Sequence, residues 1–452
     1  MKIKSLLFTS FIIMAMVLTG CSTSTDPAPT ATTAENNNTN TDSTNNNNNS
    51  KTGKIKLTCG NDAVYSGEDS VLEVSFENFE SNPEKIDVYS EASTSPLLSG
   101  AAVNSGKITI TAPANYAKNK IAYYVKSGST ESNHLSLNYY NSVSVSNFES
   151  FINSITSTDI VNIRVTGNYE DFKTKTELLK NENLKINLDI SQLTNVEIGE
   201  NAFYACTSLV CIKLPENITS IGDSSFYCCK NLAEIKLPNK LTTIGKKAFS
   251  GNALGNNGTK LTSIELPASL LTIGDKAFFA CKELINVKLQ NGITTIGAGA
   301  FVSCEKLKNI NLPDSITSIG DGSFANCYAL NIITLPSGIT GIPGYAFEEC
   351  KNLTTVIIPN GITSIYELAF YGCKKLESIS IPTSVNEIGY AAFLECTNLG
   401  NVTFVNKTGW KVTNTQTSEV TNISDNDLAD TAKAALYLRE TYKNETWTRT
   451  NQ

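Results

Sequence analysis

The stretch from Leu307 to Phe324, which reads LKNINLPDSITSIGDGSF, decides the fold of this chain. The same phrase occurs nine times, and each copy ends in a phenylalanine. These phenylalanines are Phe203, Phe226, Phe249, Phe278, Phe301, Phe324, Phe347, Phe370 and Phe393. They are 23 residues apart in every interval but one, and that interval is 29 residues. A fixed period of this length is typical of solenoids, propellers and other arrays.

Each copy contains two short apolar runs that predict strands. In the first run, Leu307, Ile310 and Leu312 alternate partly with polar residues, as in a strand with one buried face. Pro313 follows directly, and proline has no N–H to donate to a sheet, so it marks the end of the strand. The second run returns on the other side of the coil. One copy alone cannot bury both faces, so we expect the copies to stack and to gain their stability from the interfaces.

In most copies, small residues occupy two of the positions that precede the phenylalanine. The residue directly before it is always alanine or serine, because a bulkier side chain would push the ring out of its slot. Glycine follows the second apolar run in most copies, and Pro343 and Tyr366 occupy that position in the other two. We expect a positive φ at this glycine, since glycine adopts that conformation without strain. The glycines are Gly199, Gly222, Gly245, Gly274, Gly297, Gly320 and Gly389.

The spacing Leu-x-x-Ile-x-Leu is the strand signature of leucine-rich repeats. Together with the Leu-Pro corner, the Ile-Gly turn, the Ala-Phe pair and a cysteine column, it resembles the 23-residue repeat of the BspA-like bacterial surface-protein family, over roughly residues 145–452. One feature departs from general leucine-rich repeats: serine or glycine replaces the usual Asn/Cys ladder after the strand, for example at Ser315 and Gly338. The resemblance implies a surface-exposed lipoprotein that acts in adhesion.

We therefore predict a mainly β fold, in which an immunoglobulin-like β-sandwich precedes a leucine-rich-repeat solenoid with α/β caps at both ends. The predicted segments are a lipoprotein signal peptide (1–20), a disordered Asn/Ser/Thr tether (21–53), the sandwich (54–143), an N-terminal cap (144–190), the repeats (191–404) and a C-terminal cap (405–452).

The N-terminus predicts export and a lipid anchor. Lys2 and Lys4 precede an apolar run from Leu6 to Leu18 that is too short to span a bilayer comfortably. The run ends at Leu18-Thr19-Gly20-Cys21, which resembles a bacterial lipobox and implies lipidation of Cys21. Acyl chains there would hold the protein to a membrane face, at the outer membrane or cell surface. An ordinary signal peptide with a chance cysteine is the alternative.

Residues 54–143 contain short alternating segments separated by glycine, proline and asparagine, which favours an antiparallel sandwich. The segments are Leu72/Val74/Phe76, Ile86/Val88, Ile108/Ile110, Ile121/Tyr123/Val125 and Leu135/Leu137/Tyr139. Cys59 is the single cysteine of this region, so no disulfide can form within it. His134, the one histidine of the chain, is interpreted as a surface or core residue rather than a catalytic one.

The predicted caps combine helices and strands. Before the repeats we expect a helix around Phe148–Ile155, a strand at 160–165, a helix at 169–179 and the first parallel strand at 184–190. After them we expect strands near Trp410 and Val420 and one helix from Asp425 to Tyr442.

Eight cysteines lie three residues after a marker phenylalanine and form one column. They are Cys206, Cys229, Cys281, Cys304, Cys327, Cys350, Cys373 and Cys396, with Asn252 standing in once. The same role in every coil favours a small, buried free thiol over scattered disulfides. No Cys-x-x-Cys pair occurs, which weakens a metal-site interpretation.

Charge and composition exclude several functions. The net charge is −7 and no Lys/Arg block stands out, so the electrostatic footprint of nucleic-acid binding is missing. A single histidine excludes zinc sites that need several. Phosphate loops, nucleophile elbows and paired carboxylates are also missing, and we predict neither an enzyme nor a cofactor or metal.

Binding is predicted on the outward face of the long parallel sheet. The residues on either side of the inward isoleucine point out of that sheet, in two columns. We expect Lys213, Lys236, Lys288, Ile332 and Ile357 to contribute to a ligand face, because extended solenoid surfaces bind proteins.

Three functions are weighed. The first is an adhesin that binds protein or glycan ligands on host or other cells. The second is an envelope scaffold that faces the periplasm and has no external ligand. The third is a glycan-binding or enzymatic module in the sandwich.

Overall fold

The computed structural model describes residues 54–450, apart from 61–62, 78, 80–82, 92–94, 114–119, 253 and 255–256. The predicted signal peptide, the lipidation site Cys21 and the tether lie outside the described residues. Within them the chain is mainly β, with little helix. Two hydrophobic cores form, one under residues 54–143 and one that runs through the repeats.

Residues 54–144 form two sheets that share one core. The strands are β1 (Lys54–Cys59), β2 (Ala63–Tyr65), β3 (Asp69–Glu77), β4 (Lys85–Ser90), β5 (Leu98–Ala102), β6 (Lys107–Thr111), β7 (Lys120–Ser127), β8 (Thr130–Glu131) and β9 (Leu135–Ser144). The first sheet has the order β1-β3-β6 and is antiparallel. The second contains β5-β4-β7-β9, also antiparallel, and β2 pairs with β9 in parallel. Each predicted alternating segment lies in one of these strands.

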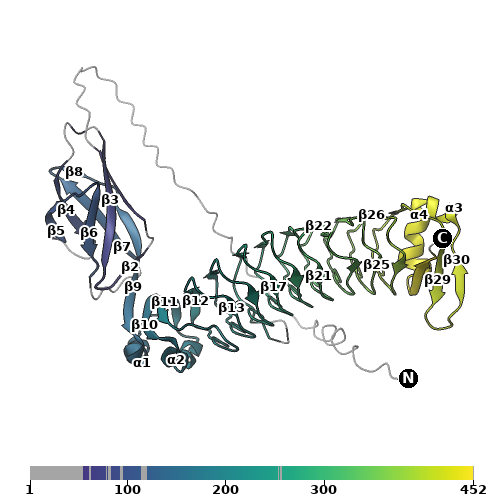
Figure 1. Ribbon diagram of the computed structural model, residues 1–452, viewed down its shortest axis with the longest axis horizontal. Helices are drawn as coiled ribbons and strands as arrows, with labels where there is room; N and C mark the ends of the chain where they lie inside the picture. Colours follow the sequence, from purple (N-terminus) through teal and green to yellow (C-terminus); the bar gives the residue numbers. More distant parts are fainter. Residues whose placement is uncertain are drawn as a thin grey trace, which may run out of the picture. The chain divides into compact units, whose positions relative to one another are not determined.

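Strand β9 links this region to the repeats (Figure 1). Its first half pairs with β7, and its second half, from Asn141 to Ser144, pairs in parallel with β10 (Ile160–Asn168). Strand β10 pairs in parallel with β11 (Lys185–Thr194), and β11 with the first repeat strand. The parallel stack therefore begins earlier than the predicted first strand at 184–190, because the last strand of the N-terminal sheets already serves as its edge.

Short helices lie between the first parallel strands. They are α1 (Val145–Ser154), α2 (Tyr169–Lys173) and the 3-10 helix η1 (Thr176–Lys180). Helix α1 buries Val145, Phe148 and Ile152, as the helical spacing predicts. The predicted single helix at 169–179 is wrong, since α2 ends at Lys173 and η1 starts only at Thr176.

Each repeat coil contributes one strand to each of two parallel ladders (Figure 1). The strands of the first ladder are β12 (Leu209–Lys213), β14 (Glu234–Lys236), β16 (Ser263–Glu265), β18 (Asn286–Lys288), β20 (Asn309–Ile310), β22 (Ile332–Thr334), β24 (Thr355–Ile357), β26 (Ser378–Ile381) and β28 (Asn401–Phe404). Those of the second are β13 (Ser220–Ile221), β15 (Thr243–Ile244), β17 (Thr272–Ile273), β19 (Thr295–Ile296), β21 (Ser318–Ile319), β23 (Gly341–Ile342), β25 (Ser364–Ile365) and β27 (Glu387–Ile388). In the coils that have a proline corner, the first strand ends one to three residues before that proline, so the prediction that the proline lies outside the strand is confirmed.

The nine marker phenylalanines form one file of stacked rings. Successive centroids are between 5.2 and 5.6 Å apart, and successive planes differ by at most 15°. All nine rings are buried. The prediction of one continuous stack is confirmed.

The glycine column has a different cause from the one predicted. None of its members has a positive φ among the described residues. A Cβ at Gly320 would instead lie 2.4 Å from the backbone nitrogen of Ala298 in the preceding coil, and Gly222, Gly245, Gly274, Gly297 and Gly389 meet similar obstacles. A Cβ added to Gly199, the first glycine of the column, would have no heavy atom within 4 Å. Glycine is required here by the close approach of neighbouring coils, not by backbone conformation.

Positive φ occurs instead two residues before each phenylalanine. The residues are Asn201, Ser224, Lys247, Lys276, Gly299, Gly322, Tyr345, Leu368 and Ala391. In this conformation the backbone N–H donates to a carbonyl of the next coil, as from Asn201 to Asp223 and from Ser224 to Lys246. The hydrogen bonds between coils hold a conformation that non-glycine residues rarely adopt.

After the last repeat the chain forms α3 (Asp425–Ala429), α4 (Thr431–Leu436), the π-helix η2 (Tyr437–Thr441), β29 (Trp410–Asn414), β30 (Val420–Asn422) and β31 (Glu445–Arg449). Strand β31 pairs antiparallel with β27. The predicted single helix from Asp425 to Tyr442 is wrong, because Asp430 interrupts it: its backbone is extended and its carboxylate accepts from Ala432 and Lys433 as an N-cap.

Candidate binding surface

The outward face of the first ladder consists of two columns of side chains. The pairing register places Cys211 beside Glu234, Lys213 beside Lys236, and Glu265 beside Lys288. The residue between the two columns, such as Ile235, is buried in every coil. All residues of both columns are exposed except Cys211, which is half-buried. The alternation that positions these side chains follows from the period of two in a strand.

The columns continue beyond the repeats into the first parallel strands. Arg164 on β10 pairs with Asp189 on β11, which pairs with Lys213 on β12. The predicted ligand face begins only at Lys213 and does not include these residues. The signal was present, because Asn162-x-Arg164 and Asn187-x-Asp189 have the same spacing as Cys211-x-Lys213.

Residues of the N-terminal sheets contact the side chains at these first positions. The guanidinium of Arg164 contacts Glu68 at 2.6 Å and lies over the ring of Tyr65. The hydroxyl of Tyr65 donates to the buried carboxylate of Asp189 at 2.9 Å. Burial, followed by the charge of Asp189, raises the pKa of the Tyr65 hydroxyl. The start of the outward face is therefore covered by its own chain.

Lys213, predicted to bind a ligand, takes part in this contact. Its ammonium lies 3.7 Å from the Asp189 carboxylate and 3.4 Å from the Tyr65 hydroxyl. Partial burial is the largest single influence and disfavours the charged form, but the Asp189 carboxylate and the Tyr65 hydroxyl together outweigh it, so the pKa of Lys213 is raised. Part of its charge is already compensated inside the protein.

The other two lysines differ from each other. Lys288 contacts Glu265 on the neighbouring strand at 2.5 Å, and its hydrogen bond to Glu265 lowers the pKa of that carboxyl. Lys236 is exposed and has no ion-pair partner among the described residues. Of the three predicted lysines, Lys236 is therefore the one without an ion-pair partner among the described residues.

Ile332 and Ile357 are the apolar residues of the face, and the structure brings them close together. Ile332 lies on β22 and pairs with Thr355, whereas Ile357 lies on β24 and pairs with Thr334. They are thus diagonal neighbours on adjacent strands, 46% and 51% exposed. Diagonal pairs on one sheet face are near enough for long side chains to touch.

Comparison with known proteins assigns the repeats. Residues 175–257, 253–373 and 324–429 match the BspA type Leucine rich repeat region, in six copies that together span more than half of the chain. The chain belongs to this family. No curated protein matches it significantly.

Several solved structures are similar to parts of the chain. A leucine rich cell surface protein from Faecalibacterium prausnitzii A2-165 is 27% identical, with a TM-score of 0.33, over 63% of this chain and 86% of that one. The leucine rich repeat protein of T. pallidum is 26% identical, with a TM-score of 0.30, over 48% and 78%. A leucine-rich repeat protein from Bacteroides ovatus is 25% identical, with a TM-score of 0.22, over 46% and 76%. Because these TM-scores are low, the family assignment rests on the match of the repeats to the family, not on the solved structures.

The cysteine column of this BspA-type solenoid consists of buried free thiols. Cys304 and Cys327 donate to the phenylalanine carbonyls of the preceding coil, at 3.3 and 3.2 Å, and the rest of the column from Cys229 to Cys396 repeats this contact. Burial raises the pKa of Cys327 to about 12. Near the longer interval, the buried Thr259 hydroxyl lies 3.4 Å from Cys281 Sγ.

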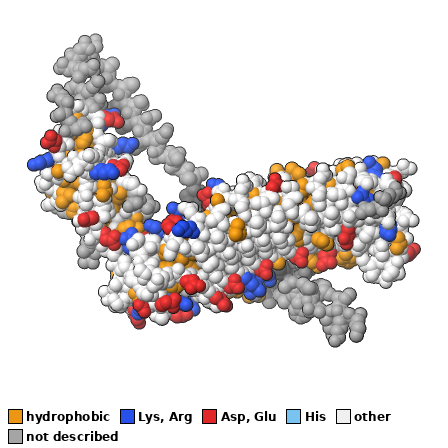
Figure 2. All heavy atoms as spheres, in the orientation of Figure 1, with side chains coloured by type: hydrophobic (Ala, Val, Ile, Leu, Met, Phe, Trp, Pro, Cys, Tyr) orange, Lys and Arg blue, Asp and Glu red, His pale blue; other side chains and the backbone are white. Residues whose placement is uncertain are grey.

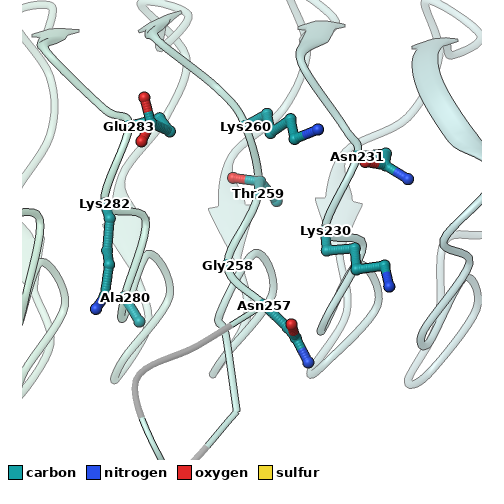
Figure 3. Close-up of a pocket in the computed structure, with 9 residues that line it drawn as sticks. All are labelled: Lys230, Asn231, Asn257, Gly258, Thr259, Lys260, Ala280, Lys282 and Glu283. Atoms are coloured by element: carbon teal, nitrogen blue, oxygen red, sulfur yellow. The ribbon is translucent and has the colours of Figure 1, made fainter. Parts of the chain in front are cut away.

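The 29-residue interval opens a hollow of about 440 Å³ on another edge of the solenoid. Lys230, Lys260 and Lys282 line it from neighbouring coils (Figure 3). Figure 3 shows that the three side chains extend apart rather than converging on one point. Lys230 and Lys282 are also paired with Glu182 and Glu305. The hollow therefore lacks the convergent charge of an anion site.

Neither a metal site nor a membrane span emerges from the described ranges. No cluster of three or more His, Cys, Asp or Glu side chains there could hold an ion. The helices of that part of the chain lack the length and apolar character needed to cross a bilayer.

Proposed function

We propose that the outward face of the first ladder binds a macromolecular partner, and that the protein is an adhesin at the bacterial surface. The observation that carries the proposal is the exposed pair Ile332 and Ile357. Apolar side chains at the centre of a polar, solvated face are typical of protein-binding patches. The partner is thus a protein of host or neighbouring cells, with glycan ligands as the alternative.

The five predicted ligand residues contribute unequally. Ile332 and Ile357 form the apolar centre, and Lys236 supplies a free positive charge at some distance along the ladder. Lys213 and Lys288 are each held by a carboxylate of the chain and contribute less. A rim charge mainly affects the rate of association, whereas the buried apolar centre determines the lifetime of the complex.

The remaining parts of the chain present this face. We propose that residues 54–143 are an immunoglobulin-like module and that residues 144–190 and 405–452 cap the solenoid. The caps are supported by the file of rings: Phe172 contacts the first ring, Phe203, and Trp410 and Trp447 pack on Phe404 beyond the last coil. Cleavage before Cys21 and lipidation of its thiol would anchor the protein to the cell surface or outer membrane.

Binding is tested with the purified full chain, immobilised and exposed to a solubilised extracellular-matrix extract. We expect Ile332→Asp and Ile357→Asp each to weaken retention of the captured protein about tenfold, because each inserts an unpaired charge at the centre of the interface. Leu271→Asp is the matched control, since Leu271 is 48% exposed and lies outside both columns. Equal retention by all three variants would contradict the proposal.

Location is tested separately by treating intact cells with protease. Loss of the protein from cells that remain intact during the treatment supports surface exposure. Full protection supports the periplasm-facing scaffold instead.

A further inference from the structure

A row of aromatic side chains crosses the outer face of the second N-terminal sheet. Tyr89 on β4 pairs with Tyr124 on β7. His134 precedes β9, whose Leu135 pairs with Tyr123, so His134 lies beside Tyr124 on the same face. The rings are parallel: Tyr89 and Tyr124 have centroids 5.0 Å apart at 7°, and Tyr124 and His134 are 4.3 Å apart at 7°. We call these three residues the aromatic row.

The aromatic row is open to ligands. The His134 side chain is 54% exposed, and both tyrosines are half-buried. Tyr89 and His134 each stack one ring face on Tyr124 and have no ring partner on the other face among the described residues. The hydroxyls of Tyr89 and Tyr124 likewise have no hydrogen-bond partner within the part of the chain that the structure describes. Both a ring face and polar atoms are thus available at one place.

Charged side chains surround the aromatic row but cancel one another. Lys126 lies 5.1 Å from the Tyr89 ring centroid and 5.3 Å from that of Tyr124. Its ammonium contacts Glu131 at 2.8 Å, and Glu131 also contacts Nε2 of His134 at 2.9 Å. The site therefore offers hydrogen-bonding groups of both kinds without an excess of positive or negative charge.

We propose that the aromatic row is a binding site for a neutral glycan. A sugar ring has an apolar C–H face that packs on an aromatic face, and a rim of hydroxyls that both donate and accept hydrogen bonds. The tyrosine hydroxyls, His134, Lys126 and Glu131 match that rim. Because the local charges are balanced, a neutral sugar fits better than a sialylated or sulfated one.

A protein partner fits this face less well. Protein interfaces have an apolar core, and the single large apolar side chain that is markedly exposed among the described residues of 54–143 is Val71, at 46%. Val71 lies on β3, in the other sheet. The aromatic row is also separate from Ile332 and Ile357, so the glycan site stands independently of the proposed solenoid function.

The test is a printed array of neutral and acidic glycans probed with the full chain, followed by titration calorimetry with a soluble oligosaccharide that it retains. We expect retention of neutral glycans, weakened about tenfold or more by Tyr124→Ala and by His134→Ala. His134→Ala changes an exposed residue, so it keeps the test valid if Tyr124→Ala unfolds the module, which circular dichroism would reveal.

Matched controls come from the solenoid. Tyr204 and Tyr227 form a similar stacked pair, 5.0 Å apart, with Lys180 over the Tyr204 ring and paired with Glu177, but no histidine among the described residues stacks on it. Tyr204→Ala and Leu271→Asp should leave glycan binding unchanged, and the aromatic-row variants should leave partner capture by the solenoid unchanged. Preference for acidic glycans, retention of no glycan, capture of a protein through the aromatic row, or binding unaffected by either aromatic-row variant would each overturn the proposal.

Discussion

At the scale of single residues, the coils approach so closely that backbone and side-chain size are coupled from one coil to the next. Tyr366 replaces the column glycine in one coil. A Cβ added to Gly341 of the preceding coil would lie only 2.7 Å from Cε2 of the Tyr366 ring. Gly341 in turn occupies a position that holds serine or threonine in the coils before it. The large side chain of Tyr366 is thus accommodated by the neighbouring Gly341, 25 residues earlier in the chain.

Gly320→Ala tests this coupling. The added methyl would meet backbone of the preceding coil, so we expect a loss of about 1–3 kcal/mol in the free energy of unfolding, as for an overpacked core. Gly199→Ala is the control, because nothing lies within 4 Å of its Cβ and stability should stay nearly constant. Urea denaturation of both variants provides the comparison, and equal losses would point to a conformational cause instead.

At the scale of elements, the sequence predicts what repeats and misses what occurs once. The file of phenylalanines, the strand ends at the prolines and the buried thiols recur in successive coils, so errors in one copy are corrected by the others. The helix break at Asp430 occurs once, and the apolar spacing that predicts one helix through it does not register a local side-chain cap. The sequence did not predict the aromatic row, because its members come from β4, from β7 and from the residue before β9, and the register of these strands is unknown from sequence alone.

The thiol column makes stability depend on pH in the alkaline range. Burial raises the pKa of Cys327 to about 12 in the folded state, against 9.0 for an ordinary thiol. The folded state therefore holds this proton more tightly, so the contribution to stability is complete below pH 9 and declines as the pH rises toward 12. Each such thiol costs about 1.4 kcal/mol per pH unit in that window.

We accordingly expect the free energy of unfolding to fall less steeply with pH in Cys327→Ala than in the natural chain, between pH 9 and about 11. Tyrosines and lysines titrate in the same range, but they are common to both proteins and cancel in the difference. The measurement is urea denaturation at several pH values. Parallel slopes would show that this thiol ionises normally in the folded state.

At the scale of the whole molecule, charged side chains are unevenly distributed over the surface (Figure 2). In that view they gather toward the first coils, while the middle of the solenoid is mostly uncharged. The contact of Arg164 with Glu68 joins residues 96 positions apart in the chain, so no local pattern predicts it. It closes the start of the outward face and leaves the later coils, with Ile332 and Ile357, as the open part.

Photo-crosslinking tests most directly that this open part is the binding surface. A crosslinking residue is placed at Thr334, which lies beside Ile357 on the outward face, and in a second protein at Leu271, outside both columns. Each full-length protein is irradiated with the same matrix extract that supplies the captured partner. The account predicts adducts of that partner at Thr334 and none at Leu271. Adducts at Leu271 alone, or none at Thr334, would contradict it.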